Sequence, residues 1–296
     1  MIAGQADEVN AGSSRGHLDR PIFIVSTPRS GSTLLFETLV AAPALFSTGR
    51  ESHGRIERVA DFHPGKRGWT SNRLTSEDAT PGAVETLAAL FYEGLNDRDG
   101  NPASGRVRML EKTPKNALRV PFFAAAWPDS LFVYLYRDVR QSLASMIEAW
   151  ASGRFRTYPM LPGWTGYPWS LLLVPGWRDL VGRPLPEIVA RQWAITTNIL
   201  LDDLECLQAE QIRTIAHGHL VAAPQQSMET LTQSLDLCWD RQLGQQLPLS
   251  KTTMSRPDPD KWRQLASVIE PMIPIVESAD ARARAFVSRF SGTATG

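Results

Sequence analysis

The sequence predicts an α/β protein with an open, mainly parallel sheet and helices on both faces. Short apolar runs alternate with segments of helical spacing, which is typical of βαβ units. Charged or polar motifs follow the carboxyl ends of three of these runs. In a parallel sheet that edge carries the binding crevice, so we expect a ligand site there.

Four strands are expected, because each apolar run is short and bounded by turn residues. They cover residues 22–26, 107–110, 131–136 and 212–216. Helices are expected where apolar residues recur at helical spacing: from residue 33 onward, over 83–95 and 116–126, from the residues after 137 to about 150, and over 187–208 and 224–235. Pro224 suits the first turn of the last helix.

The chain is expected to form one domain over residues 20–296, because 296 residues with 43% hydrophobic composition can build one large core. Residues 1–19 are polar and lack the apolar core of a signal peptide, which predicts a disordered tail and a cytoplasmic protein. Residues 154–186 are rich in Trp, Pro and Gly and lack periodicity. We interpret them as an insertion and a candidate lid over an acceptor site.

The composition disfavours several classes of partner. Thirty-one basic and thirty-one acidic side chains cancel, so no net field favours nucleic acid or a membrane surface. No apolar run approaches the roughly 18 residues that span a bilayer. Cys206 and Cys238 are too few for a disulfide framework or a metal cluster, and we expect both to be small core residues. The composition does not distinguish a monomer from a homo-oligomer.

The segment TPRSGST follows the first strand and has the features of an anion site. Gly31 permits a positive φ and close approach of a ligand to the backbone. Ser30, Ser32 and Thr33 can turn successive N–H groups inward, and the next helix adds the positive end of its dipole. The Arg29 guanidinium completes a cage for a tetrahedral anion. Strand, anion loop and helix in this order are typical of a P-loop-NTPase-like sheet.

A loop for a nucleoside triphosphate would need the pattern GxxxxGK[ST]. No first glycine stands at that spacing, and no lysine precedes Ser32. An ATP-dependent phosphotransferase is therefore an alternative that the loop disfavours. A nucleotide-binding protein without catalysis is a third hypothesis.

PRSGST after a buried strand resembles the 5′-phosphosulfate loop of sulfotransferases that use 3′-phosphoadenosine 5′-phosphosulfate (PAPS). The resemblance is to the branch with bacterial small-molecule sulfotransferases and tyrosylprotein sulfotransferases, where arginine replaces the lysine of the cytosolic animal enzymes. It implies that the chain binds PAPS through Arg29 and the loop residues Ser30, Gly31, Ser32 and Thr33. No metal-ligand motif appears, so no metal is expected.

Two further motifs resemble those of the same family. In YRDVRQSLAS, Arg137 leaves a strand and Ser145 lies eight residues later on a helix, which resembles the family's 3′-phosphate site. EKTPKN resembles the family's Lys-(Asp/Thr)-Pro motif, which implies that Lys112 reaches the sulfuryl and bridging oxygens. Lys115 is expected to be a solvated surface lysine.

A late segment, LSKTTMSRPDPDKW, resembles the family loop that closes over the nucleotide. Ser250 and Lys251 are the candidates that the resemblance implies, with Arg256 or Lys261 as further ones.

Transfer to a hydroxyl group requires a general base. The resemblance implies a glutamate soon after the anion loop, and Glu51 in STGRESHGRIE matches it, one position off in a gapless count. His53 is the alternative, because imidazole titrates near neutral pH. His217 and His219 follow the fourth strand, where they could line the crevice, but we expect structural roles for both.

The acceptor is the least specified part of the prediction. Trp164, Trp169 and Trp177 lie on the irregular segment with Tyr158 and Tyr167. Their rings could wall an apolar pocket, which would make the acceptor a hydrophobic small molecule with a hydroxyl group. A satellite core or an oligomer contact is the other interpretation.

Overall fold

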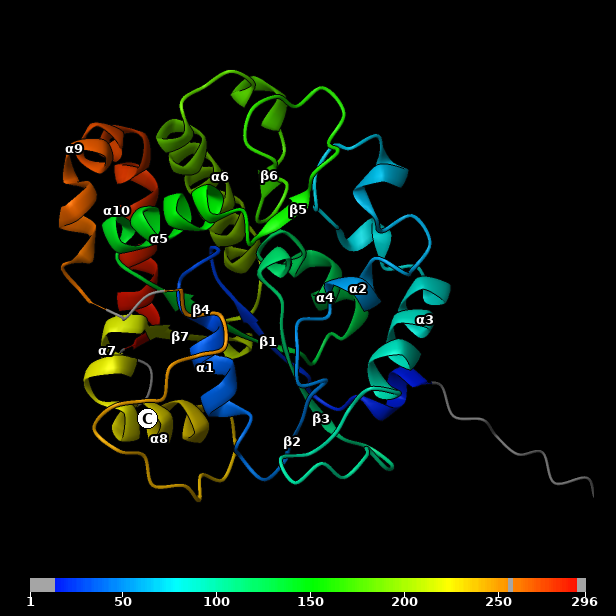
Figure 1. Cartoon of the computed structure of the whole chain (residues 1–296). Helices are drawn as coiled ribbons and strands as arrows, with labels where there is room; N and C mark the ends of the chain where they lie inside the picture. Colours follow the sequence, from blue (N-terminus) through cyan, green and yellow to red (C-terminus); the bar gives the residue numbers. More distant parts are fainter. Residues whose placement is uncertain (1–13, 255–257, 292–296) are drawn as a thin grey trace, which may run out of the picture.

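The computed structural model describes residues 14–254 and 258–291 (Figure 1). Five parallel strands form the central sheet in the order β2-β3-β1-β4-β7. They are β1 (Ile22–Val25), β2 (Leu45–Phe46), β3 (Arg108–Lys112), β4 (Leu131–Tyr136) and β7 (Ile212–Ala216). A separate antiparallel pair consists of β5 (Arg156–Tyr158) and β6 (Trp169–Ser170). The predicted open parallel sheet is confirmed.

Helices connect these strands and cover the sheet (Figure 1). They are α1 (Ser32–Leu39), α2 (His53–Ile56), α3 (Pro81–Tyr92), α4 (Val120–Ala126), α5 (Val139–Ser152), α6 (Leu185–Glu205), α7 (His217–Ala222), α8 (Pro224–Ser234), α9 (Ala266–Ile269) and α10 (Ile273–Ser291). Several begin where the sequence chemistry requires. The Asp138 side chain accepts a hydrogen bond from the backbone N–H of Gln141 and caps α5.

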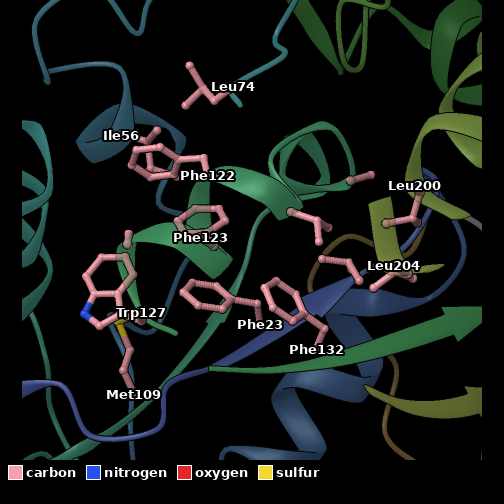
Figure 2. Close-up of a cluster of buried hydrophobic side chains, with 14 of the residues drawn as sticks. Phe23, Ile56, Leu74, Met109, Phe122, Phe123, Trp127, Phe132, Leu200 and Leu204 are labelled. Atoms are coloured by element: carbon pink, nitrogen blue, oxygen red, sulfur yellow. The ribbon is translucent and has the colours of Figure 1, made fainter. Parts of the chain in front are cut away.

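Alternate side chains of the central strand β1 serve two separate cores, which is why this strand is apolar throughout. Phe23 of β1 packs in one core with residues of α3, α4, α6 and α10, whereas Ile22 and Ile24 pack in another with α1 and α8. Figure 2 shows Phe23 and Phe132 of the sheet beside Phe123 and Trp127 of the helical layer. The Phe23 and Phe123 ring centroids are 4.2 Å apart. Helices therefore cover both faces of the sheet.

The start of the described chain differs from the prediction. Residues 14–19 were expected in a disordered tail, but Ser14–His17 form a 3₁₀ turn. Leu18 is buried in the core beside α3, and the backbone N–H of Asp19 donates to Val107 O at 2.9 Å. The burial of this one leucine accounts for the order. Residues 1–13 lie outside the described part of the chain.

The tryptophans of the insertion build a second core instead of a pocket wall. Trp169 and Trp177 are fully buried and lie edge-to-face with centroids 5.9 Å apart. Gln192 of α6 donates to Ser170 O and Leu172 O and accepts from Trp150 Nε1. The interpretation as a satellite core is therefore right for these rings, and the pocket interpretation is wrong.

Two smaller expectations concern the surface. Cys206 and Cys238 are exposed, which contradicts their expected place in the core. Among the described residues, no helix has the length and apolar character needed to cross a membrane.

Candidate active site

Four chain segments with charged or polar side chains meet at the carboxyl edge of the sheet. The TPRSGST loop follows β1, Lys112 ends β3, Arg137 follows β4, and His217 follows β7. Because the strands are parallel, these positions share one edge. They line a cleft of about 2080 Å³.

The TPRSGST loop has the backbone of an anion cradle. Arg29 and Gly31 have φ angles of 66° and 95°. A Cβ atom on Gly31 would lie 2.4 Å from His217 Cδ2, so only glycine fits. No side chain caps the N-terminus of α1, which leaves its first N–H groups for a ligand. Ser30 Oγ lies 2.7 Å from Thr27 Oγ1 in the interior, so this hydroxyl stabilises the loop instead of facing the cleft.

Arg29 and Arg137 are in contact at this loop, and Arg29 also contacts Ser145. Arg137 Nη1 donates to Arg29 O at 3.0 Å, and Arg29 Nε donates to Ser145 Oγ at 3.3 Å. Burial lowers the pKa of Arg29. Burial and the charge of Arg29 lower the pKa of Arg137 to about 10. Both guanidinium groups are only partly exposed and carry like charge, so an anion between them would relieve the penalties that lower the two pKa values.

Lys112 joins the anion loop to the predicted base. Its Nζ donates to Thr33 Oγ1 at 3.0 Å and to Glu51 Oε1 at 2.6 Å. The Lys112 side chain is 3% exposed and that of Glu51 is 31% exposed.

The protonation of Glu51 reflects its neighbours. Burial acts to raise its pKa, but His53 and Lys112 outweigh burial and hold the pKa at about 2. His53 Nδ1 lies 3.7 Å from Glu51 Oε2. Both candidate bases therefore lie in the cleft, with Glu51 nearer to Lys112 and to the loop.

Lys115 contradicts its expected place at the surface. It is buried in the cleft wall, and its Nζ donates to Glu57 Oε1 at 2.6 Å and to Tyr158 Oη at 3.0 Å. Burial lowers the pKa of Lys115 to about 8. Its sequence spacing from Lys112 carried no signal of burial, because the partners come from α2 and β5.

The late loop lies against Arg29. Both Arg29 Nη atoms donate to Thr252 O at 3.3 Å. Ser250 and Lys251 line the cleft, and the Lys251 backbone N–H donates to Glu37 Oε1 at 3.4 Å. Lys261 forms an ion pair with Glu148, with Nζ and Oε2 2.7 Å apart. The further candidate, Arg256, lies outside the described residues.

Two further residues line the cleft: His217, for which a structural role was preferred over a place in the crevice, and Phe155, which sequence reasoning missed. His217 lies against Gly31, and burial and Arg137 lower its pKa to about 4. Phe155 stacks on Arg29, with the guanidinium carbon 4.6 Å from the ring centroid. Burial and the charge of Arg137 favour the neutral imidazole, and only the pairing of β7 with β4 reveals that His217 lies beside Arg137. His219 is exposed and does not line the cleft.

Comparison with known proteins identifies the family of this chain. Residues 21–241 match the sequence model of a family described as "Sulfotransferase family". A Caenorhabditis briggsae protein named "Putative protein-tyrosine sulfotransferase" is 26% identical over 132 residues. That alignment covers 45% of this chain and 44% of the relative, less than half of either.

Solved structures show similar proteins at lower identity. The chain is similar to a sulfotransferase domain from the curacin biosynthetic pathway, at 18% identity over 86% of this chain and 98% of that one, with a TM-score of 0.43. It is also similar to a sulfotransferase from Alicyclobacillus acidocaldarius, at 15% identity over 90% and 97% of the two chains, with a TM-score of 0.47.

Proposed function

The chain belongs to the sulfotransferase family, and we propose that it transfers a sulfuryl group from PAPS to a hydroxyl group of a small-molecule acceptor. The observation that carries the proposal is the position of Lys112. It contacts Thr33 of the anion loop and Glu51 at once, so cation, loop and base meet in one cleft.

The donor set suits phosphate and sulfate groups. The loop backbone, the uncapped start of α1 and the Arg29 guanidinium converge where the 5′-phosphosulfate would bind. Arg137 and Ser145, which meet around Arg29, would hold the 3′-phosphate. Ser250 and Lys251 would cover the nucleotide from the late loop. When bound, PAPS supplies an activated sulfuryl group.

The chemistry assigned to the protein is positioning, charge stabilisation and proton transfer. A bond forms between the acceptor oxygen and sulfur while the bond from sulfur to the phosphate oxygen breaks, and the latter oxygen keeps the electron pair. Arg29 and Lys112 stabilise charge on the sulfuryl and leaving oxygens. Glu51 takes the acceptor's proton, with His53 as the alternative base.

Lys112 has to exchange partners for this assignment to work. While it binds Glu51, it contributes to holding the pKa of that carboxylate at about 2, too low for an effective base near neutral pH. A donor sulfate beside Thr33 offers Lys112 a competing anion. Glu51 then loses its cation, its pKa rises, and it becomes a stronger base.

The acceptor would bind between α2 and β5. Phe155, Leu171 and Leu172 give this part of the cleft an apolar wall. We therefore assign a partly hydrophobic acceptor, on the basis of these three residues and not of the tryptophans.

Calorimetry with 3′-phosphoadenosine 5′-phosphate, the desulfo product of PAPS, tests the donor assignment. The protein should bind it, and Arg137→Ala should weaken binding about tenfold or more because a charge-assisted contact is lost. Arg140→Ala is the matched control, since Arg140 lies three residues later, in the first turn of α5, and pairs with Glu270 at the surface. Absence of binding by the intact protein would contradict the proposal.

Labelled sulfate then tests transfer with a panel of hydroxyl compounds. ATP turnover with Mg²⁺, without affinity for the 3′-phosphorylated nucleotide, would favour the phosphotransferase alternative. If the protein binds the nucleotide but transfers sulfate to no member of the panel, and if neither Glu51→Gln nor Lys112→Met changes this background, a non-catalytic nucleotide-binding protein would be favoured.

A further inference from the structure

Lys115 contacts two segments beside the proposed acceptor compartment, residues 50–57 and residues 154–158, and both segments contribute side chains to the cleft. Its Nζ donates to Glu57 on the first segment and to Tyr158 on the second. The side chain is 8% exposed, yet the residue lines the cleft. Lys115 is therefore a buried cation at the point where an acceptor would end.

The buried cluster around Lys115 is short of negative charge. Glu57 is the one carboxylate in contact with both Lys115 and Arg119, whose Nη2 lies 3.7 Å from Glu57 Oε1. Arg119 is fully buried, and its Nη2 has no hydrogen-bond partner. Glu111 nearby is fully buried, which raises its pKa and favours its neutral form. Arg119 Nε and Nη1 donate to Asn72 O and Asn116 Oδ1, so the only unsatisfied donor of this side chain is Nη2. Two buried cations thus share Glu57, and this cluster would gain from a further anion.

The exposed edge of the same compartment, which we call the rim, also carries more positive than negative charge. Arg50, Arg154 and Arg156 line the cleft and are exposed, and none of them forms an ion pair with a described residue. The phosphate and sulfate groups of the donor already have Arg29, Arg137 and Lys112. The rim arginines thus remain for a different anion. Lys115 Nζ has three N–H donors, of which Glu57 and Tyr158 take two, so the third can donate to the same anion while the pair with Glu57 stays intact.

We infer that the acceptor carries a carboxylate or similar anionic group in addition to its hydroxyl group, and that Lys115 and the rim arginines select it. This inference rests on the proposed function and specifies its acceptor. The hydroxyl lies at Glu51, the apolar body packs on Phe155 and Leu171, and the anion reaches Lys115 or Arg156. Lys115 is then a specificity-determining residue and takes no part in the transfer itself.

Two matched probes test the inference: 3-(4-hydroxyphenyl)propionate and its methyl ester, which share the ring and the hydroxyl. Their dissociation constants are measured with the full chain saturated with 3′-phosphoadenosine 5′-phosphate, which occupies the donor side. The acid should bind about tenfold tighter than the ester or better, as expected for a charge-assisted contact. Lys115→Met should remove this preference without weakening the ester, and Lys115→Arg should retain it.

Arg156→Gln, an exposed position, should lower the preference severalfold and tests the inference even where Lys115→Met does not fold. Lys66→Met, at an exposed lysine outside the cleft, should change nothing. Equal binding of the two probes, tighter binding of the ester, or no binding of either would overturn the inference. So would a preference for the acid that survives both Lys115→Met and Arg156→Gln. Failure of the desulfo nucleotide to bind would instead contradict the proposed function.

Discussion

The cleft contains two lysine–glutamate ion pairs, Lys112–Glu51 and Lys115–Glu57. Their surroundings assign the first pair to the transfer reaction and the second to holding the cleft wall together. Lys112 and Lys115 are three residues apart in the sequence, and their partners Glu51 and Glu57 are six residues apart. Each Nζ lies 2.6 Å from an Oε1 atom. The contacts are thus nearly identical in geometry.

The surroundings of the two pairs differ. Glu51 is 31% exposed and its lysine also holds Thr33 of the anion loop, whereas Glu57 is 14% exposed and tied to Tyr158 and Arg119. The Lys112–Glu51 pair therefore opens to a ligand that can replace one partner. The Lys115–Glu57 pair joins three elements and cannot separate without leaving a buried charge. Distance alone does not distinguish a reactive pair from a structural one.

The largest difference between the pairs is expected in transfer activity. Glu51→Gln should lower kcat about 10²- to 10⁴-fold, the usual contribution of a positioned base, whereas Glu57→Gln should leave kcat of the folded protein within about tenfold. Labelled sulfate transfer to an acceptor from the panel measures both. If His53→Ala loses activity while Glu51→Gln keeps it, the base is His53, and the Lys112–Glu51 pair has no catalytic role that the Lys115–Glu57 pair lacks.

Stability should show the reverse order. Lys115→Met leaves Glu57 buried beside Arg119 at 3.7 Å, and we expect a loss of about 3 kcal/mol in the free energy of unfolding. Lys112→Met leaves a carboxylate that water can reach, with a loss of about 1 kcal/mol. Urea unfolding of both variants, with Lys66→Met as the unaffected control, checks the ranking. Equal losses would mean that the pairs are equally structural.

Donor binding should change the protonation of one pair only. If Lys112 turns from Glu51 to the sulfate, the pKa of Glu51 rises from about 2, and the protein takes up a fraction of a proton in mildly acidic buffer. Calorimetry of PAPS binding in buffers of different ionisation enthalpy measures this uptake. It should disappear in Glu51→Gln and persist in Glu57→Gln. The same uptake in all three proteins would show that Lys112 does not exchange partners.

The smallest expected effects are the pH windows of stability. The pKa of Glu51 is about 2 in the folded chain and 4.5 without its neighbours, so its stabilisation is complete above pH 4.5 and is lost as the pH falls towards 2. The pKa of Lys115 is about 8 against 10.5, so the unfolded chain binds more protons between these values and stability rises with pH there. The free energy of unfolding of the wild type, minus that of Glu51→Gln, should rise with pH between about 2 and 4.5. The difference from Lys115→Met should rise with pH between about 8 and 10.5.

Strand periodicity and the anion loop could be predicted because their signals are local. The predicted limits 131–136 and 212–216 coincide with β4 and β7, since an apolar run between turn residues has few other solutions. β2 and α10 were not predicted. β2 has only two residues, and its pairing with β3 is a long-range contact. The polar face of α10 left its helical pattern weak in a single sequence.

The sequence alone was enough to predict the class of the protein, and it indicated the donor side that we propose, because TPRSGST, Lys112, Arg137 and Ser145 each belong to a short motif typical of anion binding. Only the tertiary structure decided which neighbours those charges have. It placed Lys115 against Glu57, His217 against Gly31 and the tryptophans in a core. The physical reason is that burial and ion pairing depend on contacts between residues distant in sequence, about which local spacing carries no information.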